Sequence, residues 1–241
     1  MKHFESYSVK LQRRKKIFSF LQYILIVFLS FELFINDFAR PYKITNDSMS
    51  PNLLENYHVI TSPLVYGIKA PFSNKKLITF ALPKRGDIVT ISQSSKTPSV
   101  FLQCLNAIVR FFTLQQCQIF DAYTDNTGVL VRRIVGIPGD TIYMDKYLIY
   151  NKNQKSYHFL SEFEVSSETY DLVTQSHELW PDSLPFSSKF EAITLGENQY
   201  FVLSDNRTRI NDSRYWGVIS LDNIIAKVIL VYWPFQKFQK L

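Results

Sequence analysis

Residues 129–140 read VLVRRIVGIPGD, and residues 141–144 read TIYM. The first run is rich in β-branched residues and predicts a strand, and the segment from Gly136 to Asp140 is typical of a tight turn. The second run predicts another strand, so the whole stretch predicts two strands joined by a turn. Arg132 and Arg133 stand inside an otherwise apolar strand, which puts basic side chains on the wall of a β body.

Other β-branched runs, separated by Gly, Pro, Asn and Asp, continue this pattern along the chain. They predict strands at 58–61, 88–91, 200–203 and 224–232. Residues 151–196 are polar and irregular, and we expect them to form an insertion. The sequence therefore predicts a mainly β body with large loops.

Residues 100–120 depart from the strand pattern, because they form a long apolar run with a single charge, Arg110. The run is compatible with a helix. Its aromatic residues suit a bilayer interface, while ordinary packing on the sheet accounts for the same composition. The sequence leaves both interpretations open.

The first 38 residues combine a basic tail with an apolar segment. Residues 1–16 hold six basic residues and one acidic residue, so most of the net charge of +6 lies there. Residues 17–35 are largely apolar, and as a helix they would reach about 28 Å, close to the thickness of a hydrocarbon core. No small-x-small cleavage motif follows, and a basic cluster favours the cytoplasmic side. We expect a retained single-pass anchor with its N-terminus in the cytoplasm.

The rest of the chain is nearly neutral, which argues against nucleic-acid binding, because that function needs a charged folded face. The four histidines have no ligand spacing, and zinc-helix and phosphate-loop motifs are absent from the sequence. No metal and no other cofactor is therefore expected. Cys104 and Cys117 are either free thiols or a disulfide, since an exported domain permits both.

Ser48 is a candidate nucleophile. It lies among turn-forming residues in NDSMSP, residues 46–51, shortly after the apolar segment. A serine nucleophile needs a base to take its proton and donors to hold the oxyanion. Histidine is not well placed for this role, because His58 follows Ser48 too closely and His158 and His177 lie in the irregular insertion. A base carried on a strand, as in a Ser/Lys dyad, is the alternative.

The chain resembles the bacterial type I signal peptidases (leader peptidases), which are membrane-anchored serine proteases that remove signal peptides. Matching blocks occur in the same order and span nearly the whole chain: the apolar segment, 46–53, 66–69 with 83–89, 132–140 and 205–217. The motifs RRxxGxPGD and DSRYWG are too long to recur by chance. The resemblance implies an antiparallel β body with an inserted irregular or β subdomain, preceded by one N-terminal transmembrane helix.

The resemblance also implies roles for single residues. Ser48 would be the nucleophile, and Arg132 stands where the family has its lysine base. The Ser48 N–H and the Asn46 side chain match the oxyanion donors, and Asp212 and Arg214 match a structural ion pair. The small substrate pocket before the cut is matched by Ile44, Met49, Leu53, Leu130 and Val131.

Several positions depart from the family pattern. Arginine has a pKa above about 12, so removing its proton at neutral pH would cost at least about 7 kcal/mol. The hydroxyl residue that orients the lysine falls at Ile210, whose side chain forms no hydrogen bonds. Ser204 replaces a glycine, and Arg209 is also atypical.

Two interpretations follow from these departures. The first is a working serine endopeptidase that removes N-terminal signal peptides after a small-x-small motif, with a substitute base such as Asp47, Asp212 or a water placed by Arg132. The second is a catalytically degenerate homologue, a pseudoprotease, that binds exported chains or partners at the membrane without cutting them.

The expected organisation has three parts. Residues 1–16 form a cytoplasmic tail, 17–38 the anchor, and 39–241 an extracytoplasmic peptidase-like domain with insertions at 92–125 and about 145–198. The expected location is the inner (cytoplasmic) membrane. The expected partners are signal peptides of exported preproteins, the lipid bilayer and the secretion machinery.

Overall fold

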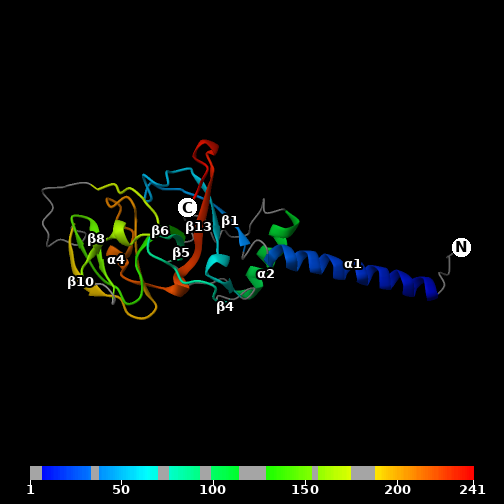
Figure 1. Ribbon diagram of the computed structural model, residues 1–241. Coiled ribbons are helices and arrows are strands. Elements are labelled where there is room, and N and C mark those ends of the chain that lie inside the picture. Colours follow the sequence, from blue (N-terminus) through cyan, green and yellow to red (C-terminus); the bar gives the residue numbers. More distant parts are fainter. Residues whose placement is uncertain are drawn as a thin grey trace.

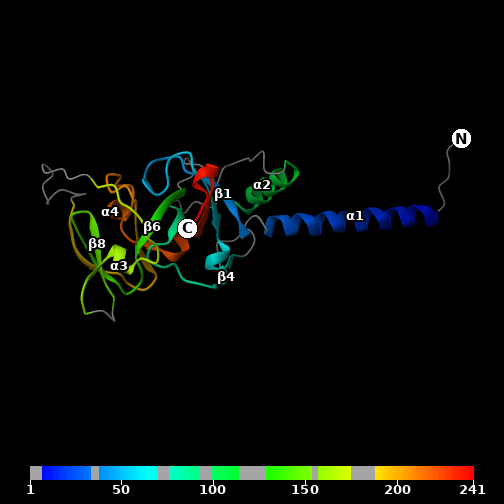
Figure 2. The same ribbon diagram turned by 45° about the horizontal axis from the view of Figure 1, so that its top comes forward.

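The computed structural model describes residues 7–33, 38–69, 76–92, 99–113, 129–153, 157–174 and 188–241. Two β-sheets hold most of the body, and a long helix, α1 (Tyr7–Leu33), projects from one end of it (Figures 1 and 2). The described part is mainly β and antiparallel, as the sequence predicts.

The larger sheet has eight strands in the order β1-β2-β13-β5-β6-β11-β12, with β14 also paired to β13. Its strands are β1 (Arg40–Lys43), β2 (His58–Ser62), β5 (Ile88–Ser92), β6 (Val129–Gly136), β11 (Gln199–Leu203), β12 (Ile219–Ser220), β13 (Ile224–Trp233) and β14 (Gln239–Lys240).

The smaller sheet has four strands in the order β10-β7-β8-β9, and a separate two-stranded ribbon pairs β3 with β4. These strands are β3 (Ile68–Lys69), β4 (Lys76–Ile78), β7 (Thr141–Asp145), β8 (Leu148–Lys152), β9 (Leu160–Ser161) and β10 (Phe190–Thr194). The shorter helices are η2 (Leu64–Tyr66), α2 (Val100–Phe112), α3 (Glu162–Val165), α4 (Ser213–Trp216), η4 (Leu221–Asn223) and η5 (Phe235–Lys237).

The turn between β6 and β7 carries the chain from the larger sheet to the smaller one. Gly139 has a φ of 85°, a conformation that suits glycine. The Asp140 carboxylate accepts the Ile137 N–H at 3.0 Å and the Arg85 Nε–H at 2.8 Å. The motif quoted first therefore joins two sheets rather than forming a hairpin within one.

The predicted strands at 58–61, 88–91, 129–135, 141–144, 200–203 and 224–232 correspond to β2, β5, β6, β7, β11 and β13. The predicted insertion after residue 145 contains β8, β9, α3 and β10, so its described part is more regular than the sequence suggests. The helix expected within 100–120 is α2. Cys104 on α2 is a free thiol, whereas Cys117 lies outside the described residues.

Helix α1 includes residues 17–33 of the predicted anchor and begins earlier, at Tyr7, inside the expected basic tail. Its apolar side chains are largely exposed, among them Phe18, Phe20, Tyr23 and Ile26. Residues 34–37 of the predicted anchor lie outside the described residues. Among the helices that the structure describes, none has the length and apolar character needed to cross a membrane.

A buried polar network joins the smaller sheet to the larger one. Glu162, at the start of α3, accepts the Ile149 N–H at 3.0 Å and the Tyr170 hydroxyl at 2.8 Å. The same carboxylate forms an ion pair with Arg207, which follows β11. Both charged side chains of this pair are almost fully buried. The network therefore fixes the loop that follows β11, which belongs to the candidate site.

Candidate active site

Ser48 lies in a tight turn that follows β1. The Ser50 N–H donates to the Asp47 carbonyl at 3.1 Å, and the Leu53 N–H donates to the Met49 carbonyl at 2.8 Å. The Asn206 N–H donates to the Ser48 carbonyl at 2.9 Å, which ties the turn to the segment after β11. Ser48 is only 5% exposed, so its hydroxyl is held in a dry, fixed position.

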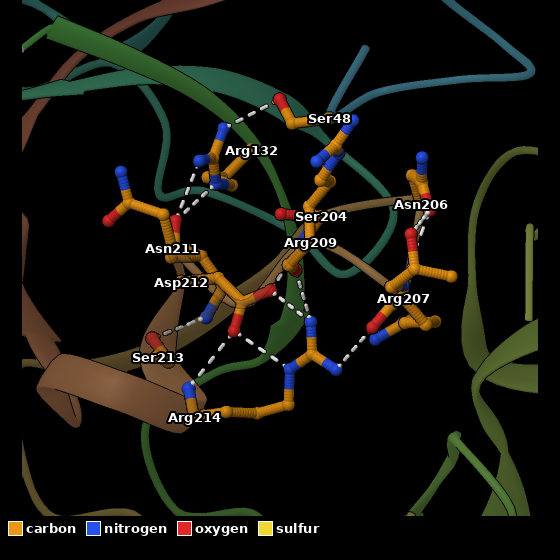
Figure 3. Close-up of polar contacts among 12 residues, drawn as sticks. Ser48, Arg132, Ser204, Asn206, Arg207, Arg209, Asn211, Asp212, Ser213 and Arg214 are labelled. Carbon is orange, nitrogen blue, oxygen red and sulfur yellow. Dashed lines mark hydrogen bonds and ion pairs between the residues drawn. The ribbon is translucent and has the colours of Figure 1, made fainter. Parts of the chain in front are cut away.

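Arg132 reaches the same place from β6. Antiparallel pairing aligns Val89 of β5 with Arg132 and Leu203 of β11 with Arg133. Arg132 is 2% exposed, and its Nη1 donates to Ser48 Oγ at 2.9 Å (Figure 3). The structure thus brings together two side chains that are 84 positions apart in the sequence.

The Arg132 guanidinium is held by carbonyl oxygens. Nε and Nη2 donate to the Asn211 carbonyl at 2.8 and 2.6 Å, and Nη1 donates to the Val131 carbonyl at 2.5 Å. No carboxylate of the described residues forms an ion pair with it. Burial lowers the pKa of Arg132 to about 10, although the negative charges of Asp212 and Asp205 oppose this shift.

This shift changes the energetics of a neutral Arg132. With a pKa of about 10, loss of the proton at pH 7 costs about 4 kcal/mol. An arginine with an ordinary pKa would need at least about 7 kcal/mol for the same step. Burial therefore lowers the cost of a neutral guanidine, while the charged guanidinium remains the predominant form at pH 7.

The neighbouring Arg133 shows the opposite behaviour. Its Nε and Nη2 donate to the two carboxylate oxygens of Asp205 at 2.7 and 2.6 Å, and its guanidinium lies 3.8 Å from the centre of the Tyr170 ring. Burial alone would lower the pKa of Arg133, but Asp205 outweighs burial and raises it. Arg133 is therefore held as the charged partner of Asp205, whereas Arg132 has no such carboxylate among the described residues.

Asn46 is the second contact of the Ser48 hydroxyl. Its Oδ1 accepts the Ser48 hydroxyl at 2.6 Å and the Ser48 N–H at 3.1 Å. Since a backbone N–H only donates, the atom that faces it must be the oxygen of the amide. In this state the Ser48 N–H is occupied, and Asn46 offers Ser48 an acceptor. For both groups to hold an oxyanion as predicted, the Asn46 side chain must rotate. Its Oδ1 must leave the Ser48 N–H, and its amide nitrogen must face the oxyanion.

The segment from Ser204 to Arg214 forms the wall behind Arg132 (Figure 3). The expected ion pair is present, since Arg214 binds Asp212 through Nε at 2.9 Å and Nη2 at 2.7 Å. Asp212 also accepts the Ser204 and Arg214 N–H groups, each at 3.1 Å. Burial would raise the pKa of Asp212, but Arg214 and these backbone groups lower it.

An exposed ion pair links the turn that holds Ser48 to this wall. Arg209 binds both carboxylate oxygens of Asp47, through Nε at 2.8 Å and Nη2 at 2.7 Å. The hydrogen bond from Arg209 lowers the pKa of Asp47. Asp47 and Asp212, the substitute bases considered from the sequence, are therefore both engaged by arginines, and among the described residues neither side chain forms a hydrogen bond with Ser48.

Ser204 and Ile210, which the sequence resemblance marks as departures, both stand on this wall. Ser204 continues the β11 ladder opposite Arg132, because Leu203 pairs with Arg133. It is fully buried, and its hydroxyl has no hydrogen-bond partner among the described residues. Ile210 is partly exposed. Position 210 thus carries no hydroxyl. The Ser204 hydroxyl lies beside Arg132 and has no hydrogen-bond partner among the described residues.

Most of the predicted pocket residues come together. Ile44, Met49, Leu53 and Val131 belong to one buried apolar cluster next to Ser48. Leu130 instead packs against a different cluster, because alternate residues of a strand face opposite sides. The structure does not bring Leu130 to the other four.

Two contacts of the site escaped sequence reasoning. The Asn211 carbonyl holds Arg132 through two of its nitrogens, and the Asn206 N–H holds the Ser48 carbonyl. Both are main-chain groups, which every residue carries, so residue type gives no signal for them. The sequence marks Arg209 as atypical, but it gives no sign that Asp47 is the ion-pair partner of Arg209.

Comparison with known proteins agrees with this arrangement. The family model described as signal peptidase, peptidase S26, matches residues 15–233. The chain belongs to the signal peptidase family. Members of this family are serine endopeptidases, and in this chain a buried serine, Ser48, contacts Arg132 of β6.

Several signal peptidases I are similar to the chain over most of their length. That of Buchnera aphidicola subsp. Baizongia pistaciae (strain Bp) is 27% identical over 237 residues, covering 89% of this chain and 74% of its own. That of Pseudomonas fluorescens is 26% identical, covering 84% and 68%, and that of Aquifex aeolicus (strain VF5) is 25% identical, covering 91% and 84%. A solved signal peptidase I from Enterococcus faecalis V583 has a TM-score of 0.34 at 18% identity over 62% of this chain and 99% of its own, too weak a similarity to add to the argument.

Proposed function

We propose that the chain is a membrane-anchored endopeptidase of signal peptidase I type, which removes N-terminal signal peptides from exported preproteins after a small-x-small motif. The observation that carries the proposal is the 2.9 Å contact between Ser48 Oγ and Arg132 Nη1, in a buried site where carbonyl oxygens rather than a carboxylate hold the guanidinium. Nucleophile and base are then side by side before substrate binds.

The reaction would be acyl transfer in two steps. Neutral Arg132 takes the Ser48 proton while Oγ attacks the substrate carbonyl, and the protonated Arg132 then gives that proton to the leaving amine. Water hydrolyses the resulting ester and frees Ser48. The cost of about 4 kcal/mol for neutral Arg132 predicts an enzyme about a thousandfold slower at pH 7 than one whose base is already neutral.

The substrate would bind as an added strand. Residues 129–131 of β6 pair with β5 on one side, whereas on the other side β11 pairs with 133–136 and Ser204 lies opposite Arg132. An extended peptide can use the open side through main-chain hydrogen bonds. The cluster of Ile44, Met49, Leu53 and Val131 would receive the small side chain before the cut. The substrate carbonyl would displace Asn46 Oδ1 from the Ser48 N–H and gain both oxyanion donors.

The N-terminal residues would hold this domain at the inner membrane. The apolar part of α1 is exposed to an extent that water does not favour, and basic residues precede it. The proposed organisation is a cytoplasmic tail at 1–16, an anchor at 17–38 and an extracytoplasmic domain at 39–241 with insertions at 92–125 and about 145–198. The partners would be exported preproteins, the bilayer and the secretion machinery.

A second function rests on the contacts of Ser48. Its hydroxyl hydrogen and its N–H are both directed to Asn46 Oδ1, and the cation that contacts its hydroxyl, Arg132, acts there as a hydrogen-bond donor. A site in this state binds a peptide without activating the nucleophile. The alternative is therefore a pseudoprotease that retains exported chains at the membrane.

Peptide cleavage separates the two functions. Purified full-length chain is incubated with a peptide that carries Ala-x-Ala before the scissile bond, with the Ser48→Ala variant as control. Slow cleavage that the control lacks supports the endopeptidase. Binding of the peptide by both proteins, without cleavage at any pH up to 10, supports the pseudoprotease.

A further inference from the structure

Helix α2 turns its apolar side outward. Phe101, Leu105, Ile108 and Phe112 recur at helical spacing and form one exposed stripe, and the two phenylalanines are each 74% exposed. The opposite side buries Asn106 and Ala107. A helix that packs on a water-soluble body has the reverse arrangement. The stripe therefore needs an apolar environment outside the body.

Helix α2 lies beside the end of α1 from which the body begins (Figures 1 and 2). The Phe111 ring contacts Phe28 and Phe31 edge to face, with centroids 5.2 and 5.3 Å apart. On the same part of α1, Leu25 and Leu29 are exposed. The exposed apolar surface of α1 thus continues onto α2.

We propose that α2 lies in the surface of the bilayer with the stripe of Phe101, Leu105, Ile108 and Phe112 among the lipid acyl chains. The partner is lipid, because the stripe is continuous with the segment proposed as the anchor; the inference rests on that part of the proposed function. Residues 100–112 contain no acidic residue, so negative headgroups would not repel the helix.

This placement gives α2 a mechanical role. A single anchor fixes the distance of a domain from the bilayer but leaves rotation about the anchor free. A second contact along α2 fixes that rotation and therefore the direction in which the site of Ser48 and Arg132 faces. Of the two interpretations left open for residues 100–120, the arrangement favours the bilayer interface for the part within α2.

Site-specific labelling tests the proposal on the full-length chain. In a Cys104→Ser/Cys117→Ser background, one cysteine is introduced by Phe101→Cys, Ile108→Cys, Leu25→Cys or Tyr157→Cys. Each variant is labelled with an environment-sensitive fluorophore and reconstituted in vesicles of phosphatidylethanolamine and phosphatidylglycerol. Quenching is measured with aqueous iodide and with lipids brominated on their acyl chains. Tyr157 is 91% exposed on the smaller-sheet side of the body and serves as the water-facing control.

The expected result is that labels at 101 and 108 respond like the label at 25. Iodide quenches them several-fold less than the label at 157, and brominated lipid quenches them strongly. If labels at 101 and 108 are as open to iodide as the label at 157 while position 25 stays shielded, this inference is overturned and the anchor stands. If position 25 is also open to iodide, the anchor itself is refuted.

Hydroxyl-radical footprinting of the unmodified chain gives an independent reading that does not depend on the variants folding. In vesicles, Phe101 and Phe112 should resist oxidation while Tyr157 is oxidised. Protection by a second copy of the chain would disappear when the protein is diluted into excess lipid, and that result would contradict the proposal. Protection by the bilayer persists on dilution.

Discussion

At the scale of single residues, Arg132 and Arg133 show how contacts decide chemistry. They are adjacent on β6 and equally buried, at 2% exposed each. Arg133 binds the Asp205 carboxylate through two nitrogens and has a raised pKa, whereas Arg132 meets carbonyl oxygens and the Ser48 hydroxyl and has a lowered pKa. Residue type does not separate them, because both are arginines in one strand; only the family resemblance singles out Arg132.

Replacement of Arg132 by lysine tests its proposed role. Burial lowers the pKa of a lysine further toward neutrality than that of an arginine, because lysine starts about two units lower. We expect Arg132→Lys to raise kcat/KM for an Ala-x-Ala peptide at pH 7 by about tenfold or more. Addition of Ile210→Ser should raise it again by orienting the amine. The triple variant with Ser48→Ala should be silent, and a double variant no faster than wild type would contradict the role.

Ser204 offers a test of stability at the same scale. An unpartnered buried hydroxyl costs about 1–3 kcal/mol, so Ser204→Ala should raise the free energy of unfolding by about 1 kcal/mol. Ser213 is the matched control, because it is also buried but its Oγ accepts the Val202 N–H at 3.0 Å. Ser213→Ala should lower the free energy of unfolding by a similar amount. Urea unfolding measures both, and equal losses would mean that the Ser204 hydroxyl has a partner.

The meeting of Ser48 and Arg132 could be predicted from the order of the motifs. The occupation of the Ser48 N–H by Asn46 could not, because the sequence does not say which atom of an amide faces a turn. The pKa of Arg132 depends on burial and on the nearby charges of Asp212 and Asp205, and both belong to the folded structure.

At the scale of elements, Asp212 joins β11, the wall of the site and α4. It binds Arg214, accepts the Ser204 N–H and caps α4 through the Arg214 N–H. With the Arg214 side chain buried beside it, loss of the charge on Asp212 leaves a buried cation with carbonyl oxygens but no carboxylate to balance it.

Acid should weaken this contact. The folded pKa of Asp212 lies below its ordinary value of 3.8, so its contribution to stability is complete above that value and is lost as the pH falls through the folded pKa. The Asp212→Asn variant should therefore have a free energy of unfolding about 3 kcal/mol lower than that of wild type at pH 7. This difference should disappear in strong acid. Urea unfolding at several pH values gives the comparison. A difference that does not change with pH would show that the charge is irrelevant.

The long strands were predictable because their β-branched runs are sharply bounded by turn residues. The strands within the insertion were not, since β9 and β10 lie among polar residues and take their order from pairing with β8 and β7. The apolar run at 100–112 predicts helix α2. Which side of the helix is exposed depends on the fold, because Asn106 is buried on the opposite side.

At the scale of the whole molecule, the pair of Glu162 and Arg207 connects the two sheets. Glu162→Gln removes the charge that balances a fully buried guanidinium, and it should lower the free energy of unfolding by about 3–5 kcal/mol. The exposed pair of Lys189 and Asp145, 3.8 Å apart, is the control, and Lys189→Ala should change stability by less than about 0.5 kcal/mol. Equal effects in urea unfolding would mean that the network does not hold the sheets together.

The pH dependence of peptide cleavage tests the central claim most directly. If neutral Arg132 is the base for Ser48, kcat/KM of the wild-type chain rises tenfold per pH unit from pH 7 and levels off near pH 10, whereas Arg132→Lys levels off at a lower pH. Ser48→Ala is inactive throughout. A wild-type profile that is flat between pH 7 and 10, or a plateau that Arg132→Lys leaves in place, would contradict the claim.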